Sequence, residues 1–549
     1  MKGKGPENGV ILAACIGDCV HVAGVMAFLD IARSHGFETT FMGPAVPVSS
    51  LLEEAGRLKP DIIAISYRLD PSALGNLLSE FKEGISKARI EGTRLLFGGT
   101  PATGEIAKKS GIFSHIFTGG ESPDEVRVIL LQEQAQPEAN KAHAKNLIER
   151  IEGKKPFPLL RHHFGLPTVE ETVKGAREIA MAGVLDVLSL GPDQNAQEHF
   201  FHPEDMDPAQ NGAGGVPVRT REDFIRIYEA SRCGNHPLVR CYSGTRDIIK
   251  MAAVLKETIH NAWCAVPLFW YNVLDGRSTR PLKDAISENQ QVMKWHADRG
   301  IPVEVNEAHH WSLRNAPDAV AVATAFLAAY NAKKMGVKHY VAQYMLNTPP
   351  ATYARMDLAK MLAKIELIEA LHDNDFISYR QVRGGLASMS PEKDFAKGQL
   401  AASTFLGMLL RPHIVHVVGF SEAYDVARPK EVIESVQIAA GTIHNILDGS
   451  IDIQNDPIIM ERKEFLLKEA GVILDAIYTI GKGSPDPWSD PETLASAVKL
   501  GILDAPHLVG NPAACGKITT RIIDGACWSC DPHTGEPVTE GQRIRALGL

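Results

Sequence analysis

Residues 10–24 read VILAACIGDCVHVAG, an apolar run that passes through a glycine into a polar loop and a further glycine. A buried parallel strand has this kind of sequence, because helices cover both faces of its sheet. Helical patterns separate this run from the apolar runs that follow it, and we predict strands at 10–16, 38–42, 61–66, 94–97 and 115–117. Strands that alternate with helices of about 10–15 residues indicate a doubly wound α/β fold with a parallel sheet.

The composition of the 549-residue chain excludes several classes of protein. Hydrophobic residues make up 44% and charged residues 22%, which is ordinary for a globular protein. A net charge of −9 gives no basic field for nucleic acid or an anionic membrane. No apolar run approaches the ~20 residues of a membrane helix, and the start, MKGKGPENG, is too polar for a signal peptide. We therefore expect a cytoplasmic enzyme.

The alternation of strands and helices resumes after residue 158 and continues for roughly eight units. We predict strands at 159–163, 187–190, 238–242, 262–269, 302–307, 340–345, 376–381 and 414–418. Eight βα units indicate a (βα)8 TIM barrel, whose active sites form at the C-terminal ends of the strands. The polar residues between the two regions form a linker with some helix. We predict domains at 1–130 and 158–450, a linker at 131–157, and a C-terminal extension at 451–549 packed on the barrel.

Small or polar residues follow several strands of the first domain. His21 and Gly24 come after the first strand, Ser66 ends the third, and two glycine pairs, Gly98-Gly99 and Gly119-Gly120, end the fourth and fifth. Open α/β sheets bind ligands at this edge. A lone histidine here is more often a plain turn residue, but small neighbours leave a slot that a ligand can enter.

These residues resemble the cobalamin-binding domain of cobalamin-dependent mutases and methionine synthase. The signature of that family is Asp-x-His-x-x-Gly, then Ser-x-Leu, then Gly-Gly, and three elements match it in order: His21-x-x-Gly24, Ser66 and Gly98-Gly99. The resemblance implies a flavodoxin-like domain in which His21 is the lower ligand of cobalt. The glycine-lined slot would hold the nucleotide tail of the cofactor.

The aspartate of the signature is displaced in this chain. Asp18 lies three residues before His21 instead of two. A carboxylate that contacts a ligating histidine tunes the basicity of the imidazole. The displacement of Asp18 therefore predicts altered cobalt electronics more than altered binding.

The barrel region resembles the catalytic epsilon chain of glutamate mutase, also called methylaspartate mutase. The likeness is diffuse over residues 155–549 and clearest at FWYNVLDG (269–276), at VVGFSEA (417–423), at YTIGKGSPDPWSDPETLASAVKLGILDAP (478–506) and at CGKIT (515–519). The resemblance implies an adenosylcobalamin-dependent carbon-skeleton mutase, a radical isomerase. In that family the adenosyl radical takes a hydrogen atom from a carboxylate substrate inside the barrel.

The resemblance assigns roles to individual residues. Arg161 and Arg240 match substrate-binding arginines at strand ends. Tyr271 matches a substrate-binding tyrosine, Glu307 an active-site glutamate and Glu422 a ribose-binding acid. The substrate pocket also departs from the family, because Ala265 replaces the carboxylate that receives the substrate amine, and Val418 replaces the lysine partner of Glu422. We therefore expect a small carboxylate substrate with fewer charges than glutamate.

Other functions remain open from the sequence. A corrinoid-dependent methyltransferase also pairs such a domain with a barrel, whereas a non-catalytic cobalamin carrier or sensor would not need one. His309-His310 and Cys527-x-x-Cys530 lack the further ligands that a zinc site requires, so we expect structural thiols and no metal besides cobalt. We expect a homodimer that binds neither nucleic acid nor a membrane.

Overall fold

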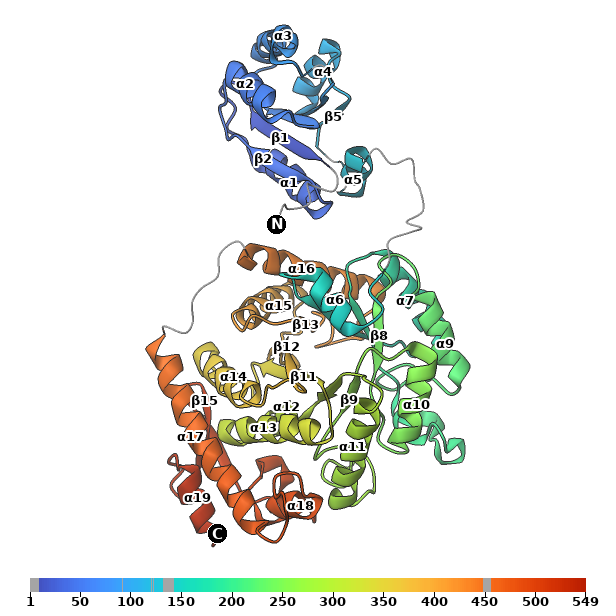
Figure 1. Cartoon of the computed structure of the whole chain (residues 1–549), viewed down its shortest axis with the longest axis vertical. Coiled ribbons are helices and arrows are strands. Elements are labelled where there is room, and N and C mark those ends of the chain that lie inside the picture. The colour runs from blue at the N-terminus through green and yellow to red at the C-terminus, as the bar shows by residue number, and fades with distance from the viewer. Residues whose placement is uncertain (1–8, 91, 120, 122, 132–142, 448–455) are drawn as a thin grey trace. The chain divides into compact units, whose positions relative to one another are not determined.

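The computed structural model describes residues 9–90, 92–119, 121, 123–131, 143–447 and 456–549 (Figure 1). It divides the chain into two compact units, Met1–Lys141 and Ala142–Leu549. Residues 132–142 of the predicted linker, and residues 448–455 around the predicted end of the barrel, lie outside the described residues. The rest of the linker contains helix α6 (Leu147–Lys154), whose apolar side chains pack under the barrel with Trp263.

The first unit is a parallel sheet between helices, with strand order β2-β1-β3-β4-β5. Its elements are β1 (Val10–Cys15), α1 (Ala23–Ser34), β2 (Glu38–Phe41), α2 (Val48–Leu58), β3 (Ile62–Tyr67), α3 (Pro71–Ala88), β4 (Arg94–Gly99), α4 (Pro101–Ser110), β5 (His115–Phe117) and α5 (Pro123–Leu131). This is the flavodoxin-like order, in which the chain reverses direction across the sheet between β1 and β3. The predicted doubly wound sheet is confirmed.

The local sequence explains how these elements begin and pack. Strand β3 is buried along its whole length, as the apolar run predicts for a sheet covered on both faces. Helix α3 begins where the Asp70 carboxylate accepts hydrogen bonds from two backbone N–H groups, and Pro71 occupies its first turn. Leu74, Leu78 and Phe81 recur on one face of α3 and are buried against the sheet.

The second unit is an eight-stranded parallel sheet in the order β8-β7-β6-β13-β12-β11-β10-β9. A parallel bridge between Tyr242 and Ala265, with a 3.2 Å hydrogen bond from Ser243 N to Ala265 O, joins β8 to β9 and closes the barrel. The strands are β6 (Leu159–Phe164), β7 (Val187–Leu190), β8 (Leu238–Cys241), β9 (Cys264–Val266), β10 (Val303–Val305), β11 (His339–Leu346), β12 (Ile377–Gly384) and β13 (Ile414–Val417). The predicted TIM barrel is confirmed strand by strand.

Helices surround this barrel (Figure 1). They are α7 (Val169–Met181), α8 (Gln194–His199), α9 (Arg221–Ala230), α10 (Ile248–Ile259), α11 (Leu282–Ala297), α12 (Glu307–Ser312), α13 (Asp318–Lys334), α14 (Ala354–Glu369), α15 (Lys393–Met408) and α16 (Pro429–Leu447). Helix α13 is buried on nearly all sides because the C-terminal extension covers its outer face. No described helix is long and apolar enough to cross a membrane.

The inside of the barrel changes character along its axis. At the N-terminal end, an apolar layer contains Leu159, Val187, Leu238, Val341, Tyr379 and Ile414. Two residues further along the strands, the same face carries polar side chains, among them Arg161, Ser189, Arg240, Gln343, Gln381 and His416. Successive residues of a strand alternate between its faces, so both sets point inward. Apolar layers normally fill a TIM barrel, and the polar levels here leave a cavity instead.

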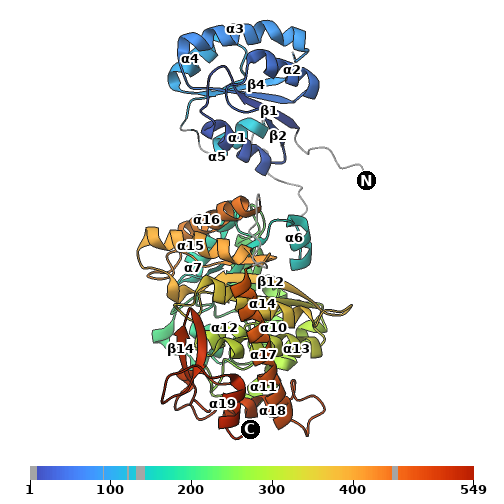
Figure 2. The same cartoon turned by 90° about the vertical axis from the view of Figure 1, so that its left-hand side faces the viewer.

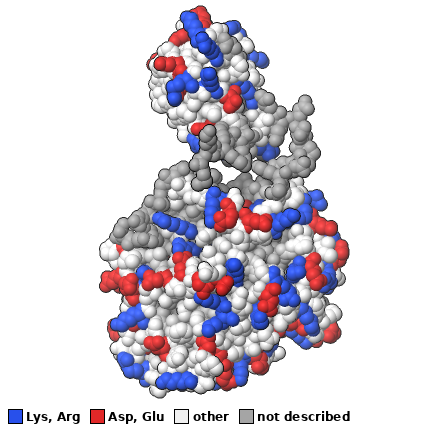
Figure 3. Space-filling view, viewed as in Figure 1, with Lys and Arg blue, Asp and Glu red and all other residues white. Residues whose placement is uncertain are grey.

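The C-terminal extension consists of α17 (Pro457–Ile480), α18 (Pro491–Leu500), the hairpin β14 (Thr519–Ile523) and β15 (Ala526–Cys530), and α19 (Glu540–Ala546). Helix α17 packs against α13 and α14, and Figure 2 shows the hairpin and α19 beside it. Basic and acidic side chains are interspersed over the face of the molecule in Figure 3.

A buried carboxylate ties this extension to the barrel. Asp318 begins α13, and its Oδ1 lies 3.1 Å from Lys360 Nζ on α14. Its Oδ2 accepts hydrogen bonds from Arg462 on α17 (3.3 Å) and from the backbone N–H of Cys527 on β15 (3.2 Å). Asp318 and Lys360 are both fully buried, and Lys360 Nζ also lies 3.0 Å from Oδ1 of buried Asp357, so these charges compensate one another.

We predict that Asp318→Asn strongly destabilises the second unit, by about 3–5 kcal/mol, because it removes the carboxylate that pairs with buried Arg462 and leaves Lys360 with Asp357 alone. Tryptophan fluorescence during urea unfolding reports this unit alone, since every tryptophan of the chain lies after residue 262. Asp475→Asn on the exposed face of α17 is the control, with an expected change within ~0.5 kcal/mol. Equal unfolding midpoints for the two variants would contradict this role of Asp318.

Candidate functional site

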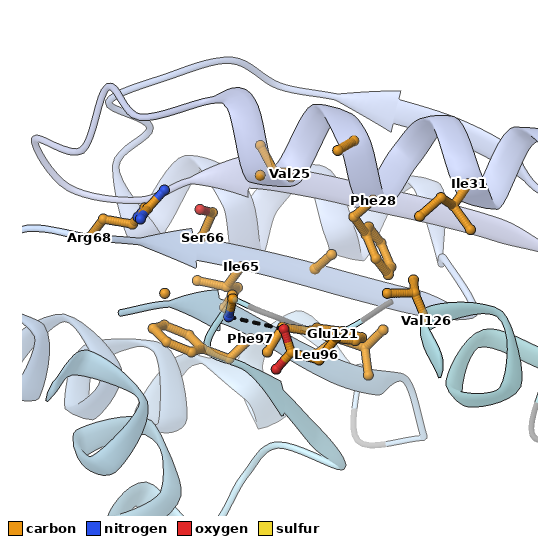
Figure 4. A pocket seen from close by; sticks show the side chains of 17 residues that line it. Val25, Phe28, Ile31, Ile65, Ser66, Arg68, Leu96, Phe97, Glu121 and Val126 are labelled. Carbon is orange, nitrogen blue, oxygen red and sulfur yellow. Dashed lines mark hydrogen bonds between the residues drawn. The ribbon is translucent and has the colours of Figure 1, made fainter. Parts of the chain in front are cut away.

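A slot in the first unit lies between α1 and the carboxyl ends of β3, β4 and β5. It encloses about 340 Å³. Figure 4 shows Val25, Phe28 and Ile31 of α1 on one side of the slot, facing Ile65 and Leu96 of the sheet. The walls are mainly apolar. The predicted residues Gly24, Ser66, Gly98, Gly99 and Gly119 all line it, so the fold brings these separate strand ends together.

The slot requires glycine at Gly98, Gly99 and Gly119 for three different physical reasons. A Cβ atom on Gly98 would meet nothing within 4 Å, so the missing side chain is what keeps the space open. Gly99 has no such room, because a Cβ atom there would lie 2.7 Å from the carbonyl oxygen of Tyr67. Gly119 adopts a φ of 91°, which L-residues with a side chain rarely adopt. Gly120, which we also predicted to line the slot, lies outside the described residues.

Glu121 adds a carboxylate to this apolar slot, and the sequence analysis missed it. It accepts hydrogen bonds of 2.9 Å from the backbone N–H groups of Thr118 and Gly119. Burial alone would raise the pKa of Glu121, but these backbone hydrogen bonds outweigh it and hold the pKa below its ordinary value. The carboxylate therefore fixes the loop after β5, which forms one wall of the slot.

His21 lies in the loop before α1, and its side chain is exposed. Asp18 is exposed as well, whereas Cys19 is buried. The Sγ atom of Cys19 lies 3.9 Å from His21 Nδ1, and Cys15 Sγ donates to the His21 carbonyl oxygen over 3.6 Å. The position two residues before His21, where the family signature has its aspartate, is thus a thiol that contacts the imidazole.

A second cavity, of about 330 Å³, opens inside the barrel. Its lining includes Arg161, Tyr242, Tyr271, Glu304, His309, His310 and Arg383. Arg161 and Arg240, predicted at strand ends, are the third residues of β6 and β8 and are 1% and 0% exposed. They lie deeper than predicted, because inward alternation places them above the apolar layer of the barrel.

Glu304 joins these two arginines, and the sequence analysis missed it. Its Oε2 atom lies 3.3 Å from Arg161 NH1 and 3.5 Å from Arg240 NH2, and it accepts a 2.7 Å hydrogen bond from Trp263 Nε1. The Trp263 ring also lies 5.6 Å and 5.3 Å from the two guanidinium carbons. Burial would raise the pKa of Glu304, but the two arginines and Trp263 outweigh it and lower the pKa. The carboxylate is therefore ionised and shared.

Glu307 does not line the cavity described above. Its Oε2 accepts hydrogen bonds from the backbone N–H groups of Leu268 (2.8 Å) and Phe269 (3.1 Å), and its Oε1 accepts one from Trp311 Nε1 (2.7 Å). Burial raises the pKa of Glu307 to about 7, although these donors oppose the effect. In this structure Glu307 holds the segment after β9 against α12, which is a positioning role.

Tyr271 lines the cavity from that segment. Its φ of 66° is unusual for a residue with a bulky side chain, and its carbonyl oxygen accepts a 2.7 Å hydrogen bond from Arg280. Arg277 lies over its ring at 4.5 Å. Burial raises the pKa of the Tyr271 phenol to about 12, so the hydroxyl is neutral and can donate to a ligand.

Glu422 lines a wider pocket at the barrel mouth, of about 720 Å³. The two barrel pockets share Gln197, Tyr242, Arg383 and Leu386, so they adjoin. Glu422 accepts a 2.7 Å hydrogen bond from the Gly419 N–H, and its Oε1 lies 3.4 Å from His162 Nε2. The structure thus places Arg161, Tyr271 and Glu422 around connected spaces, with Arg240 directly behind them.

Many polar atoms of the barrel interior have no hydrogen-bond partner among the described residues. They include Arg240 Nε and NH1, Arg383 Nε, Asn306 Oδ1, His309 Nδ1, His310 Nε2 and Gln343 Oε1. Buried polar groups in folded proteins are nearly always paired, so a group of unpaired ones around one cavity indicates a polar ligand. Within the described residues, the carboxylate and histidine group close enough to share a metal is His202, Glu204 and Asp205, away from these pockets.

The family model and the curated relatives match residues of the first unit. Residues 9–127 match the family model of the B12 binding domain. The chain therefore contains a B12-binding domain. Over 114 residues this domain is 31% identical to trimethylamine corrinoid protein 2 of Methanosarcina acetivorans, covering 20% of this chain and 50% of that protein. It is 27% identical over 131 residues to dimethylamine corrinoid protein 3 of the same organism, covering 24% and 60%.

The chain thus spans about half the length of these curated relatives. A solved structure, a cobalamin-binding protein from Desulfitobacterium hafniense, matches 22% of this chain and 58% of its own, at 20% identity and a TM-score of 0.20. The residues present in the B12-binding domain fit a corrinoid. Its glycine-lined apolar slot is open, and an exposed imidazole lies in the loop before α1.

We predict that His21→Gly weakens cobalamin binding and shifts the visible spectrum of the bound cofactor. Loss of a residue that merely contacts a ligand costs about 10–100-fold in metal affinity, so loss of the ligand itself is expected to cost at least as much. Titration of the purified chain with aquocobalamin, followed by absorption, measures both effects. Asp18→Ala is the control, since Cys19 contacts the imidazole. An unchanged spectrum for His21→Gly would show that His21 is not the ligand.

We also predict that Gly98→Val leaves the fold intact but lowers cobalamin affinity by about tenfold or more, equivalent to ~1.4 kcal/mol. The added side chain enters free space in the slot, so no protein atom clashes with it. Gly75→Val is the matched control, because its Cβ also meets no atom and it lies in α3, outside the slot. Similar affinities for the two variants would exclude the slot as the cofactor site.

Proposed function

We propose that this protein is a cobalamin-dependent isomerase, an adenosylcobalamin-dependent carbon-skeleton mutase that acts on a small anionic acid inside the barrel. The observation that supports this most is the buried cavity whose polar lining converges from separate strands. Arg161 on β6, Glu304 on β10 and Arg383 on β12 all line it. Arg240 on β8 lies behind it with two unpaired guanidinium nitrogens.

The chain's own residues would bind, orient and isolate the substrate. Guanidinium groups suit carboxylates because they can donate two parallel hydrogen bonds. The barrel wall is closed on all sides by paired strands, and an apolar layer seals its N-terminal end. When bound, adenosylcobalamin supplies radical chemistry, and the protein contributes orientation and exclusion of competing reactions.

Corrinoid-dependent methyl transfer is the second candidate. The names of the relatives, trimethylamine and dimethylamine corrinoid proteins, favour it for the B12-binding domain. Methylamines are cations at neutral pH, however, and the barrel cavity is lined by arginines whose charges would repel them. Burial is the main cause that lowers the pKa of Arg161 to about 9, and the like charge of Arg240 adds to it, so an anionic ligand would favour the charged form of this guanidinium. The cavity therefore supports isomerisation of an anion over methylamine chemistry.

The deciding experiment compares the full chain loaded with adenosylcobalamin and with methylcobalamin. Each form is mixed with a panel of small mono- and dicarboxylic acids and with trimethylamine. An acid-dependent radical signal in electron spin resonance with adenosylcobalamin supports the mutase. Trimethylamine-dependent change of the methylcobalamin spectrum, without any radical signal, would overturn it in favour of methyl transfer.

We predict that Arg240→Lys lowers the affinity of the barrel for its acid substrate by tens-fold to thousands-fold, corresponding to about 2–5 kcal/mol. An ammonium group cannot reproduce the planar fork of a guanidinium. Arg226→Lys is the matched control, because Arg226 pairs with Glu170 on the outer surface of the barrel. Both variants should bind cobalamin normally. Equal loss of substrate affinity in the two would rule out a substrate-binding role for Arg240.

A further inference from the structure

The charges around the barrel cavity are unbalanced in a way that restricts the ligand. Arg161, Arg277 and Arg383 line the cavity, and Arg240 lies directly behind it. Glu304 is the carboxylate that lines it among the described residues. Guanidinium groups therefore outnumber carboxylates there, and a ligand with more than one negative charge would restore the balance.

His309 and His310 line the cavity, His163 lines the adjoining pocket, and His416 contacts the His163 ring, but these histidines do not change the balance of charge. Burial lowers the pKa of His163, His309, His310 and His416 well below the ordinary value, and nearby cationic groups add to the effect. These rings are therefore neutral at physiological pH, where they can donate or accept hydrogen bonds but carry no charge.

Among the described residues, the carboxylates that border this cavity are already paired with arginines, whereas Glu422 lines the adjoining pocket at the barrel mouth. Glu304 Oε2 is shared by two arginines and Trp263. Asp275 Oδ2 lies 3.5 Å from Arg277 Nε and 3.6 Å from Arg314 NH2. The in-register neighbour of Glu304 on β9 is Ala265, which offers no charge.

The arginines also lie at two levels of the barrel. Arg161 and Arg240 are in the middle of their strands, directly above the apolar layer that contains Leu159 and Leu238. Arg383 is two residues beyond Gln381 on β12, towards the mouth, and Arg277 lies in the segment after β9. Donors at two depths suit two separated anionic groups better than one compact phosphate.

We infer that the substrate of this site is a small dicarboxylate that carries no ammonium group. Glu304 sets this preference, because it is the carboxylate that lines the cavity among the described residues and it is already paired with Arg161 and Arg240. This inference rests on the proposed function and names its substrate class. It excludes amino acids such as glutamate, whose ammonium would enter a cationic site without an anionic partner. The buried apolar run Val266, Leu268, Phe269 and Trp270 does not line the cavity.

Calorimetric titration of the adenosylcobalamin-loaded full chain tests the inference with ligands of equal length. Glutarate, glutamate and pentanoate share a five-carbon chain, and succinate, aspartate and butanoate form the corresponding four-carbon set. In at least one set the dicarboxylate is expected to bind about tenfold or more tightly than its two partners. The monocarboxylate lacks one set of charged hydrogen bonds, and the amino acid brings an ammonium group that has no anionic partner. Binding does not require turnover, so the result is independent of whether isomerisation occurs.

Glu304→Gln tests the role of the shared carboxylate. If Glu304 serves the arginines, the variant still prefers the dicarboxylate over the amino acid. If Glu304 instead holds an ammonium group, the variant loses affinity for glutamate or aspartate alone. Arg226→Gln, on the outer surface, is the control for a change of charge.

Three results would overturn the inference: an amino acid that binds as tightly as its dicarboxylate, a monocarboxylate that does so, or no binding by either set. The wild-type comparison alone gives these results, so the inference stays testable even where Glu304→Gln does not fold. A radical signal with some other acid would then leave the proposed isomerase standing while this substrate class fails. Failure of both would remove the proposed function as well.

Discussion

The barrel depends on one buried carboxylate, that of Glu304, which two arginines and a tryptophan N–H share. Two guanidinium groups at 1% and 0% exposure would be very costly to bury without an anion, since desolvation of each ion costs several kcal/mol. Glu304 offsets part of this cost, and the Trp263 ring beneath both guanidinium groups adds cation–π contact. The pairing remains incomplete, because Arg240 Nε and NH1 lack partners among the described residues. Glu304 thus compensates part of the positive charge of the two arginines, and the remaining positive charge favours binding of a second anion.

The two binding spaces of the chain are built from different kinds of side chain. In the B12-binding domain, small residues at strand ends open an apolar slot, and hydrogen bonds from backbone N–H groups fix its edge at Glu121. In the barrel, charged side chains from opposite strands meet in the middle, and neutral histidines and amides fill the space between them. The first arrangement suits a large, mostly apolar cofactor with few directional contacts. The second suits a small polar ligand held by many charged hydrogen bonds.

Much of this architecture could be predicted from the sequence, for a physical reason. Strands covered on both faces must be apolar, so runs such as those at 10–16 and 187–190 mark β1 and β7 closely. The slot residues Gly24, Ser66 and Gly98 were predictable because strand ends of a parallel sheet meet at one edge. Resemblance placed Arg161 and Arg240 in the site, yet it put them at strand ends, and the structure shows them deeper in the barrel.

Glu304 and Arg383 could not be found from those signals, because each lies inside a strand whose other residues are ordinary. What distinguishes them is alternation. Glu304 and Asn306 are two positions apart, as are Gln381 and Arg383, so the members of each pair face the interior of the barrel. Glu307, which the resemblance matches to an active-site acid, does not line this cavity. It is the first residue of α12, beyond the end of β10, and its carboxylate accepts hydrogen bonds from backbone N–H groups of the segment after β9. In a barrel with known strand positions, alternation along each strand identifies the side chains that face the interior. The contact between Cys19 and His21 had no comparable signal, since it depends on the path of a loop.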